Sequence, residues 1–325
     1  MKEFDIIKSY FLTKSFQRRD VQLGIGDDCA LTTVPEGQQL VTTTDTLIEN
    51  VHFPKETTGR AVAHKALTVN LSDLAAMGAE PAWISLSLSL PEYNETWLRD
   101  FSLSLQELTE YYSVQLIGGD TVQGPLSITI TAQGFIPVGQ ALMRSKAKPG
   151  DWLYVTGTLG DAGLGLALLQ TDQQCELHHR NYFINRLDFP TPRLLAGTTL
   201  RRIATSCIDL SDGIKSDIQH ILFASQVGAT VDVDKLPLSE AMLTTVGKDE
   251  GIRYALTSGD DYELMFTIPE EQKGSLDLAF ANCNVPATCI GRINGVAEKL
   301  TLKYDDKDYT LPEGGERESG FEHFS

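Results

Sequence analysis

The clearest pattern in the chain is a strict alternation of apolar and hydroxyl side chains over residues 83–90. The segment reads "WISLSLSL", with Ile84 and the leucines on one face of the expected strand and the serines on the other. A period of two is typical of a β-strand, because successive side chains point to opposite faces of a sheet. The small hydroxyl face indicates close packing on that side too, and another subunit is a candidate for it.

Helical and strand patterns surround this segment. Helices are predicted near residues 3–11, 59–78 and 95–112; the second is built of good helix formers and ends at Gly78, shortly before Pro81. The short β-type runs of the first half are "CALTTV", "QLVTTTDT", "VQLIGGD" and "LSITITAQGFI".

Pro149 and Gly150 interrupt the pattern, and we place a domain boundary there, giving domains 1–148 and 149–325. After it, strands are predicted at "WLYVTG", "SCIDLSDG", "ATVDV", "YELMFTI" and "ATCIGRI", and helices near 161–170, 192–204, 214–227 and 270–281. The predicted fold class is α+β, with two α/β domains that contain mixed sheets.

Composition supports two folded domains. A chain of 325 residues is long for one hydrophobic core, and its 42% apolar residues argue against disorder. Its 44 acidic and 27 basic residues give a net charge of −17, which predicts no nucleic-acid and no membrane partner. Five scattered cysteines without zinc-knuckle spacing indicate reduced thiols and a cytoplasmic protein. No apolar run approaches transmembrane length.

Aspartates recur beside glycine or hydroxyl residues, and several follow predicted strands. They are Asp27, Asp28, Asp45 (after Thr43 and Thr44), Asp73, Asp120, Asp209, Asp212, Asp260 and Asp261. Any one of them could simply cap a helix or shape a turn. Carboxylates gathered without Lys or Arg repel one another, however, so the set as a whole favours hard cations such as Mg²⁺.

Other candidate chemistry is less specific. Zinc is disfavoured, and His178 and His179 lie in a polar stretch typical of a surface. His52 could equally be a packed imidazole. The chain has no P-loop motif, but its glycine loops at 118–119 and 157–165 could hold an anion or be tight turns. Arg144, with two neighbouring lysines, is either in a solvated basic loop or part of a phosphate clamp.

Together these motifs resemble the bacterial thiamine-monophosphate kinase family. The segments are "LGIGDDCAL", "TTTDTLIENVHF", "KALTVNLSDLAAMGAEPAW", "QLIGGDT", "GFIPVGQALMRSKAKPGDWLYVTGTLGD", "IDLSDGIKSD", "SGDDYEL" and "GFEHF". They occur in order over nearly the whole chain. The wider superfamily includes aminoimidazole-ribonucleotide synthetase, so the resemblance implies N- and C-terminal domains like those of that enzyme.

The resemblance also implies an activity and a site. The activity is in-line phosphoryl transfer from ATP to thiamine monophosphate, assisted by several Mg²⁺ ions, in a homodimer joined through the N-terminal sheets. The implied magnesium residues are Asp28, Thr43, Thr44, Asp45, Asp73, Asp120, Asp209 and Asp212. The implied ATP contacts are Gly119, Asp120, Arg144 and Ser211, and the implied acceptor contacts are His52, Asp260 and Phe321. Asp260 stands where many members have Glu, so its acceptor contact rests on a shorter side chain.

Acceptor chemistry agrees with the absence of a recognisable general base. A phosphate monoester has a second pKa of about 6, so its oxygen is mostly ionised at neutral pH and needs no base. Three alternatives remain open at the level of sequence: a related superfamily synthetase with another acceptor, a metal-ion phosphate hydrolase, and a non-enzymatic divalent-cation-binding protein.

Overall fold

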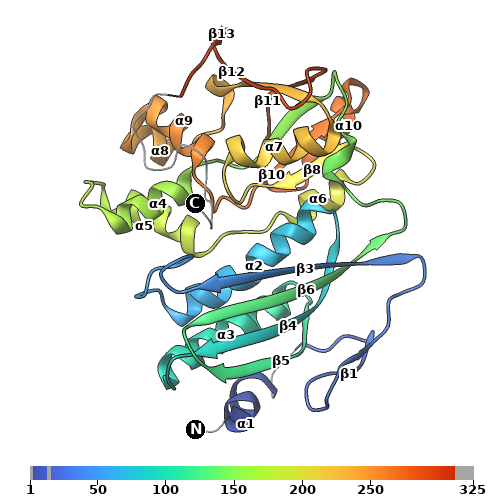
Figure 1. The fold of residues 1–325 in the computed structure, drawn as a ribbon, viewed down its shortest axis with the longest axis vertical. Helices are drawn as coiled ribbons and strands as arrows, with labels where there is room; N and C mark the ends of the chain where they lie inside the picture. Colours follow the sequence, from blue (N-terminus) through green and yellow to red (C-terminus); the bar gives the residue numbers. More distant parts are fainter. Residues whose placement is uncertain (1–2, 13–15, 312–325) are drawn as a thin grey trace. The chain divides into compact units, whose positions relative to one another are not determined.

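The structure is a computed structural model that describes residues 3–12 and 16–311 (Figure 1). The chain divides into two compact units. One contains the described residues up to Leu74 together with Ala79–Gly139, and the other contains Ala75–Gly78 together with the described residues from Gln140 onward. No helix in these described ranges is both long enough and apolar enough to cross a membrane.

The first unit is built on a four-stranded sheet in the order β3-β6-β4-β5. Its strands are β3 (Gln38–Ile48), β4 (Glu80–Leu90), β5 (Gln115–Gln123) and β6 (Ser127–Pro137). The pair β4–β5 is parallel and the other pairs are antiparallel, so the sheet is mixed as predicted. Helices α2 (Gly59–Ala76) and α3 (Glu95–Tyr111) lie against one face of this sheet (Figure 1).

The alternating segment forms β4, and its two faces differ as predicted. Ile84 and Leu88 are fully buried, whereas Ser87 is exposed on the other face. On that open face the hydroxyls of β3 and β6 pair across the strands, Thr44 with Thr131 at 2.9 Å and Thr46 with Thr129 at 2.8 Å between Oγ1 atoms. The sheet therefore has an apolar face under the helices and a face rich in hydroxyl groups.

Smaller elements complete the first unit. The predicted opening helix is α1 (Glu3–Ile6) followed by a π-helical turn over Ile7–Leu12. The run "CALTTV" forms only the short strand β2 (Leu31–Thr32), which pairs with β1 (Val21–Leu23).

The second unit contains a seven-stranded mixed sheet in the order β13-β12-β9-β11-β7-β10-β8. Its strands are β7 (Trp152–Thr156), β8 (Ser206–Asp209), β9 (Gly228–Asp232), β10 (Leu264–Ile268), β11 (Ala287–Asn294), β12 (Leu300–Tyr304) and β13 (Lys307–Asp308). Its helices are α4 (Asp161–Gln170), α5 (Leu177–Asp188), α6 (Leu194–Leu200), α7 (Ile214–Ser225), α8 (Glu240–Thr245), α9 (Gly247–Thr257) and α10 (Lys273–Phe280), with short 3₁₀ turns at Arg144–Lys146, Val233–Lys235 and Glu270–Gln272.

Both faces of this second sheet are buried. Leu153 and Val155 of β7 pack in a core with residues of α7 and α9. Tyr154 of the same strand packs on the opposite side, in a core with residues of α6 and α10. Burial on both faces explains why β10 is buried at every position and mostly apolar, instead of alternating.

The structure corrects two parts of the sequence interpretation. Asp45 and Asp120 lie inside β3 and β5, not at strand ends, because the residues after them continue the pairing with β6 and β4. Five helices and strands of the second unit were also not predicted, namely α5, α8, α9, β12 and β13. The α+β fold with two domains and mixed sheets is confirmed.

Candidate functional site

Three of the predicted magnesium residues meet between β3 and α2. Thr43 and Asp45 are two residues apart on β3, so their side chains share the face that α2 covers. Asp73 lies on α2, and its Oδ2 accepts a short hydrogen bond from Thr43 Oγ1. The register of β3 and the position of Asp73 on α2 thus bring two carboxylates and a hydroxyl together.

The electrostatics of this group fit a cation. Burial raises the pKa of Asp45 to about 6, and the charge of Asp73 contributes to the rise. Both effects disfavour the ionised form, and a divalent cation bound by the two carboxylates would reverse them. Oxygen ligands of this type are those that Mg²⁺ prefers, so the residues present fit a magnesium ion.

Two other predicted ligands lie on the open face of the same sheet. The Thr44 hydroxyl pairs with Thr131 there, so the hydroxyls of Thr43 and Thr44 point to opposite sides. Asp120 is exposed and pairs in register with Ser87. Because β3 and β5 are the two edge strands, three strand spacings of about 4.8 Å separate Asp120 from Asp45, or about 14 Å. Within one chain, Asp120 and Asp45 therefore do not share an ion.

Residue 119 must be a glycine for a structural reason, in addition to its predicted nucleotide contact. Its φ is +153°, and a Cβ at this position would lie 1.8 Å from the backbone oxygen of Leu86. The close pairing of β4 and β5 thus excludes a side chain at residue 119.

The loop between β1 and β2 separates the roles of its two aspartates. The Asp27 carboxylate accepts a hydrogen bond from the N–H of Asp28 at 2.8 Å, so Asp27 shapes the turn. The Asp28 side chain is exposed. His52 is half-buried, and its Nδ1 accepts the N–H of Ile48 at 3.0 Å.

In the second unit, two predicted site loops lie directly against each other. The N–H of Asp260 donates to the carbonyl of Ser211 at 2.9 Å. Gly259 makes this approach possible, since a Cβ there would lie 2.0 Å from the Ser211 oxygen. Asp260 has a φ of +67° and its Oδ1 accepts the Tyr262 hydroxyl at 3.1 Å, so the loop holds this side chain in a defined position.

Asp209 and Asp212 also lie in the second unit, beside a third carboxylate that the sequence interpretation missed. Asp209 ends β8 and is buried. Asp217, on α7, accepts the N–H of Asp212 at 3.1 Å. Burial raises the pKa of Asp217 to about 8, with the charges of Asp212 and Asp209 adding to the rise and backbone N–H groups opposing it. The spacing "DGIKSD" is the signal that could have identified Asp217.

The basic loop is anchored through its backbone. The Ser225 hydroxyl of α7 donates to the Arg144 carbonyl at 2.7 Å and accepts the N–H of Ala147 at 3.1 Å. The Arg144 side chain is exposed. This anchoring leaves the guanidinium available to an external anion.

Comparison with known proteins identifies the family. Residues 26–136 match the N-terminal domain of AIR synthase related proteins, and residues 148–303 match their C-terminal domain. The chain is 51% identical to thiamine-monophosphate kinase of Salmonella typhimurium, over 99% of this chain and 98% of that protein.

The chain belongs to the thiamine-monophosphate kinase family. It is therefore a kinase, and the family resemblance drawn from the eight segments is confirmed.

Solved structures of the thiamine-monophosphate kinase family share this fold. The enzyme from Stenotrophomonas maltophilia matches with a TM-score of 0.83 at 43% identity, covering 94% of this chain and 96% of that one. A second structure, AaThiL complexed with AMPPCP and TMP, matches with a TM-score of 0.75 at 32% identity, covering 92% of each chain.

This thiamine-monophosphate kinase family member also contains a buried ion network that sequence reasoning missed. Glu263 is fully buried, and its carboxylate accepts hydrogen bonds from Arg193, Arg186 and the Thr156 hydroxyl. Asp161, also fully buried, accepts the hydroxyls of Thr158, Tyr182 and Ser239. Glu263 lies directly after the loop that contains Asp260. The network therefore fixes the end of the predicted acceptor loop.

Phe321, the remaining predicted acceptor contact, lies outside the described residues.

Proposed function

We propose that this kinase transfers the terminal phosphoryl group of ATP to thiamine monophosphate, giving ADP and thiamine diphosphate. The observation that carries the proposal is full-length similarity to proteins named thiamine-monophosphate kinase, at 42–51% identity for several of them. A relative in complex with AMPPCP and TMP supports the same pair of substrates. The paired carboxylates described above are the part of this chain best suited to phosphate chemistry.

The proposed roles follow the chemistry of each group. Asp45 and Asp73, with Thr43, would hold Mg²⁺. When bound, such ions neutralise phosphate charge and align the attacking and leaving oxygens for in-line transfer. The further magnesium residues proposed are Asp28, Thr44, Asp120, Asp209 and Asp212. The Thr44 hydroxyl lies on the open face of the sheet, opposite the face that carries Asp45 and Asp73.

The substrate contacts are proposed on the same basis. Gly119, Asp120, Arg144 and Ser211 would contact ATP, and His52, Asp260 and Phe321 would contact the acceptor. The cationic thiazolium of thiamine suits a carboxylate and an aromatic ring.

The open sheet face supports the proposed homodimer. The Thr44–Thr131 and Thr46–Thr129 pairs lie on it, and apolar side chains at its margins are partly exposed, among them Leu40, Ile48 and Val122. Small hydroxyl groups flanked by apolar residues allow two sheets to approach closely. A second copy would also bring another Asp120 to this face.

All five cysteines are free thiols, which favours a cytoplasmic location.

The function is tested by the choice of acceptor. Free thiamine offers a hydroxyl that must lose a proton, whereas the monophosphate already carries an oxyanion. General-base assistance is typically worth about 100-fold or more, so we expect the monophosphate to be preferred by at least about 100-fold. The assay supplies each acceptor at equal concentration with ATP and Mg²⁺, and identifies products by chromatography. Comparable phosphorylation of free thiamine would defeat the mechanism, and absence of thiamine diphosphate would defeat the proposed function.

Arg144→Ala should weaken ATP binding by about tenfold while leaving binding of thiamine monophosphate nearly unchanged. A hydrogen bond between charged groups is worth about 1.5–3 kcal/mol, which corresponds to tenfold or more in affinity. Isothermal titration calorimetry measures both affinities. Lys148→Ala removes the same charge from the same exposed loop and serves as the control. An unchanged ATP affinity, or an equal loss in both variants, would return Arg144 to the role of a solvated loop residue.

A further inference from the structure

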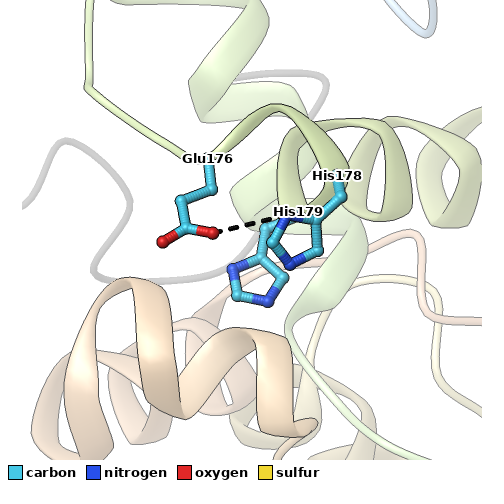
Figure 2. A group of neighbouring side chains, drawn as sticks. All are labelled: Glu176, His178 and His179. Atoms are coloured by element: carbon cyan, nitrogen blue, oxygen red, sulfur yellow. Dashed lines mark ion pairs between the residues drawn. The ribbon is translucent and has the colours of Figure 1, made fainter.

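A second group of metal-ligating side chains lies at the beginning of α5, separate from the proposed magnesium residues. Glu176 is the residue before the helix, and His178 and His179 are in its first turn. One ligand atom from each of the three lies within 4.8 Å of the others (Figure 2). The sequence alone disfavours zinc at this polar stretch, but on this geometry we propose that Glu176, His178 and His179 bind a divalent transition metal such as Zn²⁺.

The ligand types decide which class of metal this group favours. Imidazole nitrogens suit Zn²⁺, Ni²⁺ and Cu²⁺, whereas Mg²⁺ prefers an all-oxygen environment. Two imidazoles with one carboxylate match the ligand set of common zinc sites, in which water fills a remaining position. The group therefore differs chemically from the oxygen-only carboxylates of the first unit, and excess Mg²⁺ should not compete strongly for it.

The structure already orients one of the imidazoles. His179 Nδ1 lies 3.2 Å from the Thr245 hydroxyl at the end of α8. If Nδ1 makes this hydrogen bond, Nε2 remains for the metal, which is how hydrogen bonds commonly orient histidine ligands. The His178 and His179 rings are 4.0 Å apart between centroids; His178 is exposed and His179 is half-buried, so a modest rotation of the His178 side chain brings their nitrogens into a shared coordination sphere.

An ion pair alone gives little reason for this arrangement to persist in water. His178 Nδ1 and Glu176 Oε2 are 3.4 Å apart, but the two side chains are 70% and 71% exposed. Pairs this exposed contribute little. The positive end of the helix dipole opposes a cation at this position, and the Glu176 carboxylate offsets it. A bound metal would tie the residues before α5 to α8 through His179 and Thr245.

The test uses the full chain with Zn²⁺ as the probe, in excess Mg²⁺ so that the oxygen sites are occupied. Competition with a chromogenic zinc chelator measures stoichiometry and affinity. We expect the double variant H178Q/H179Q to lose one equivalent of bound Zn²⁺, and Glu176→Gln to weaken binding by about tenfold. The matched control is His220→Gln, which removes an exposed histidine on α7 and should bind as the unmodified chain does.

A spectroscopic measurement keeps the outcome independent of catalysis. Co²⁺ in place of Zn²⁺ should give the visible absorption of a nitrogen-ligated site in the unmodified chain and in His220→Gln, but not in H178Q/H179Q. Circular dichroism checks that each variant is folded. Equal Zn²⁺ binding by the unmodified chain and the double variant would overturn the proposal, as would an equal loss in His220→Gln. Neither result bears on the choice of phosphate acceptor.

Discussion

Asp45→Asn and Asp73→Asn should each reduce turnover by about 100-fold or more at limiting Mg²⁺, with the fold intact. Each change removes one negative charge from the paired carboxylates with almost no change in shape. Even groups that only support a metal ligand typically change affinity by about 10–100-fold, so loss of a ligand charge should have at least that effect. In Asp73→Asn, the amide oxygen of the new side chain can still accept the Thr43 hydroxyl, which preserves the local packing. Steady-state rates measured over a range of Mg²⁺ concentrations show the loss.

Asp45→Asn should lower turnover but should not lower the stability of the folded chain. The pKa of Asp45 in the folded chain is raised to about 6, above its ordinary value, so ionisation of this group is less favourable in the folded state. Its contribution to stability is therefore greatest at low pH and is lost as the pH rises through about 6. Without Mg²⁺ at neutral pH, Asp45→Asn, which places a neutral side chain there, should be at least as stable as the unmodified chain in urea unfolding.

Asp27→Asn is the matched control for both variants. Asp27 is an exposed aspartate whose carboxylate accepts a hydrogen bond within its own turn, and an asparagine can make the same bond. Its turnover should stay close to that of the unmodified chain. Near-normal turnover of Asp45→Asn or Asp73→Asn at limiting Mg²⁺ would exclude a necessary metal role for that residue.

Glu263→Gln should lower the free energy of unfolding by about 3–5 kcal/mol, the usual result of removing one partner from a buried ion pair. The Glu263 carboxylate is fully buried and accepts from Arg193 Nε at 2.6 Å, from Arg186 Nη2 at 3.3 Å and from the Thr156 hydroxyl at 2.7 Å. A glutamine keeps the shape but leaves guanidinium charge without its counter-charge, and its amide hydrogens face donors. Urea unfolding followed by circular dichroism measures the change.

The control for this prediction is an ion pair near the surface. Glu250 and Arg253 form an i,i+3 pair on α9, with 42% and 28% of their side chains exposed. Glu250→Gln should therefore cost no more than about 1 kcal/mol. If Glu263→Gln destabilised the chain no more than Glu250→Gln does, the buried network would not hold the second unit together.

The sequence alone determined the features that depend on local pattern. The alternation over residues 83–90 identified β4 and its two faces, because burial on one side of a sheet selects every second residue. The run at 161–170 identified α4 at the residues where the structure has it. The ordered motifs identified the family, and the resemblance implied Thr43, Asp45 and Asp73 among the magnesium residues.

The local sequence pattern did not predict secondary structure correctly where a segment is stabilised by residues distant in the sequence. Helix α5 reads "LHHRNYFINRLD", which is largely polar, and two of its residues, Phe183 and Leu187, supply its buried apolar contacts. The sequence predicts that a strand ends near Asp45, because nothing local shows that β3 continues to Ile48 along β6.

Only the tertiary structure decided which side chains of the candidate site can act together. Thr43 and Thr44 are neighbours in sequence, yet the pleat of β3 sends their hydroxyls to opposite faces. Asp120 follows the same kind of glycine-rich segment as other site residues, yet the strand order places it on the far edge of the sheet. Glu263 lies 70 and 77 residues from Arg193 and Arg186 in the sequence, so only the folded chain brings the guanidinium groups to the buried carboxylate.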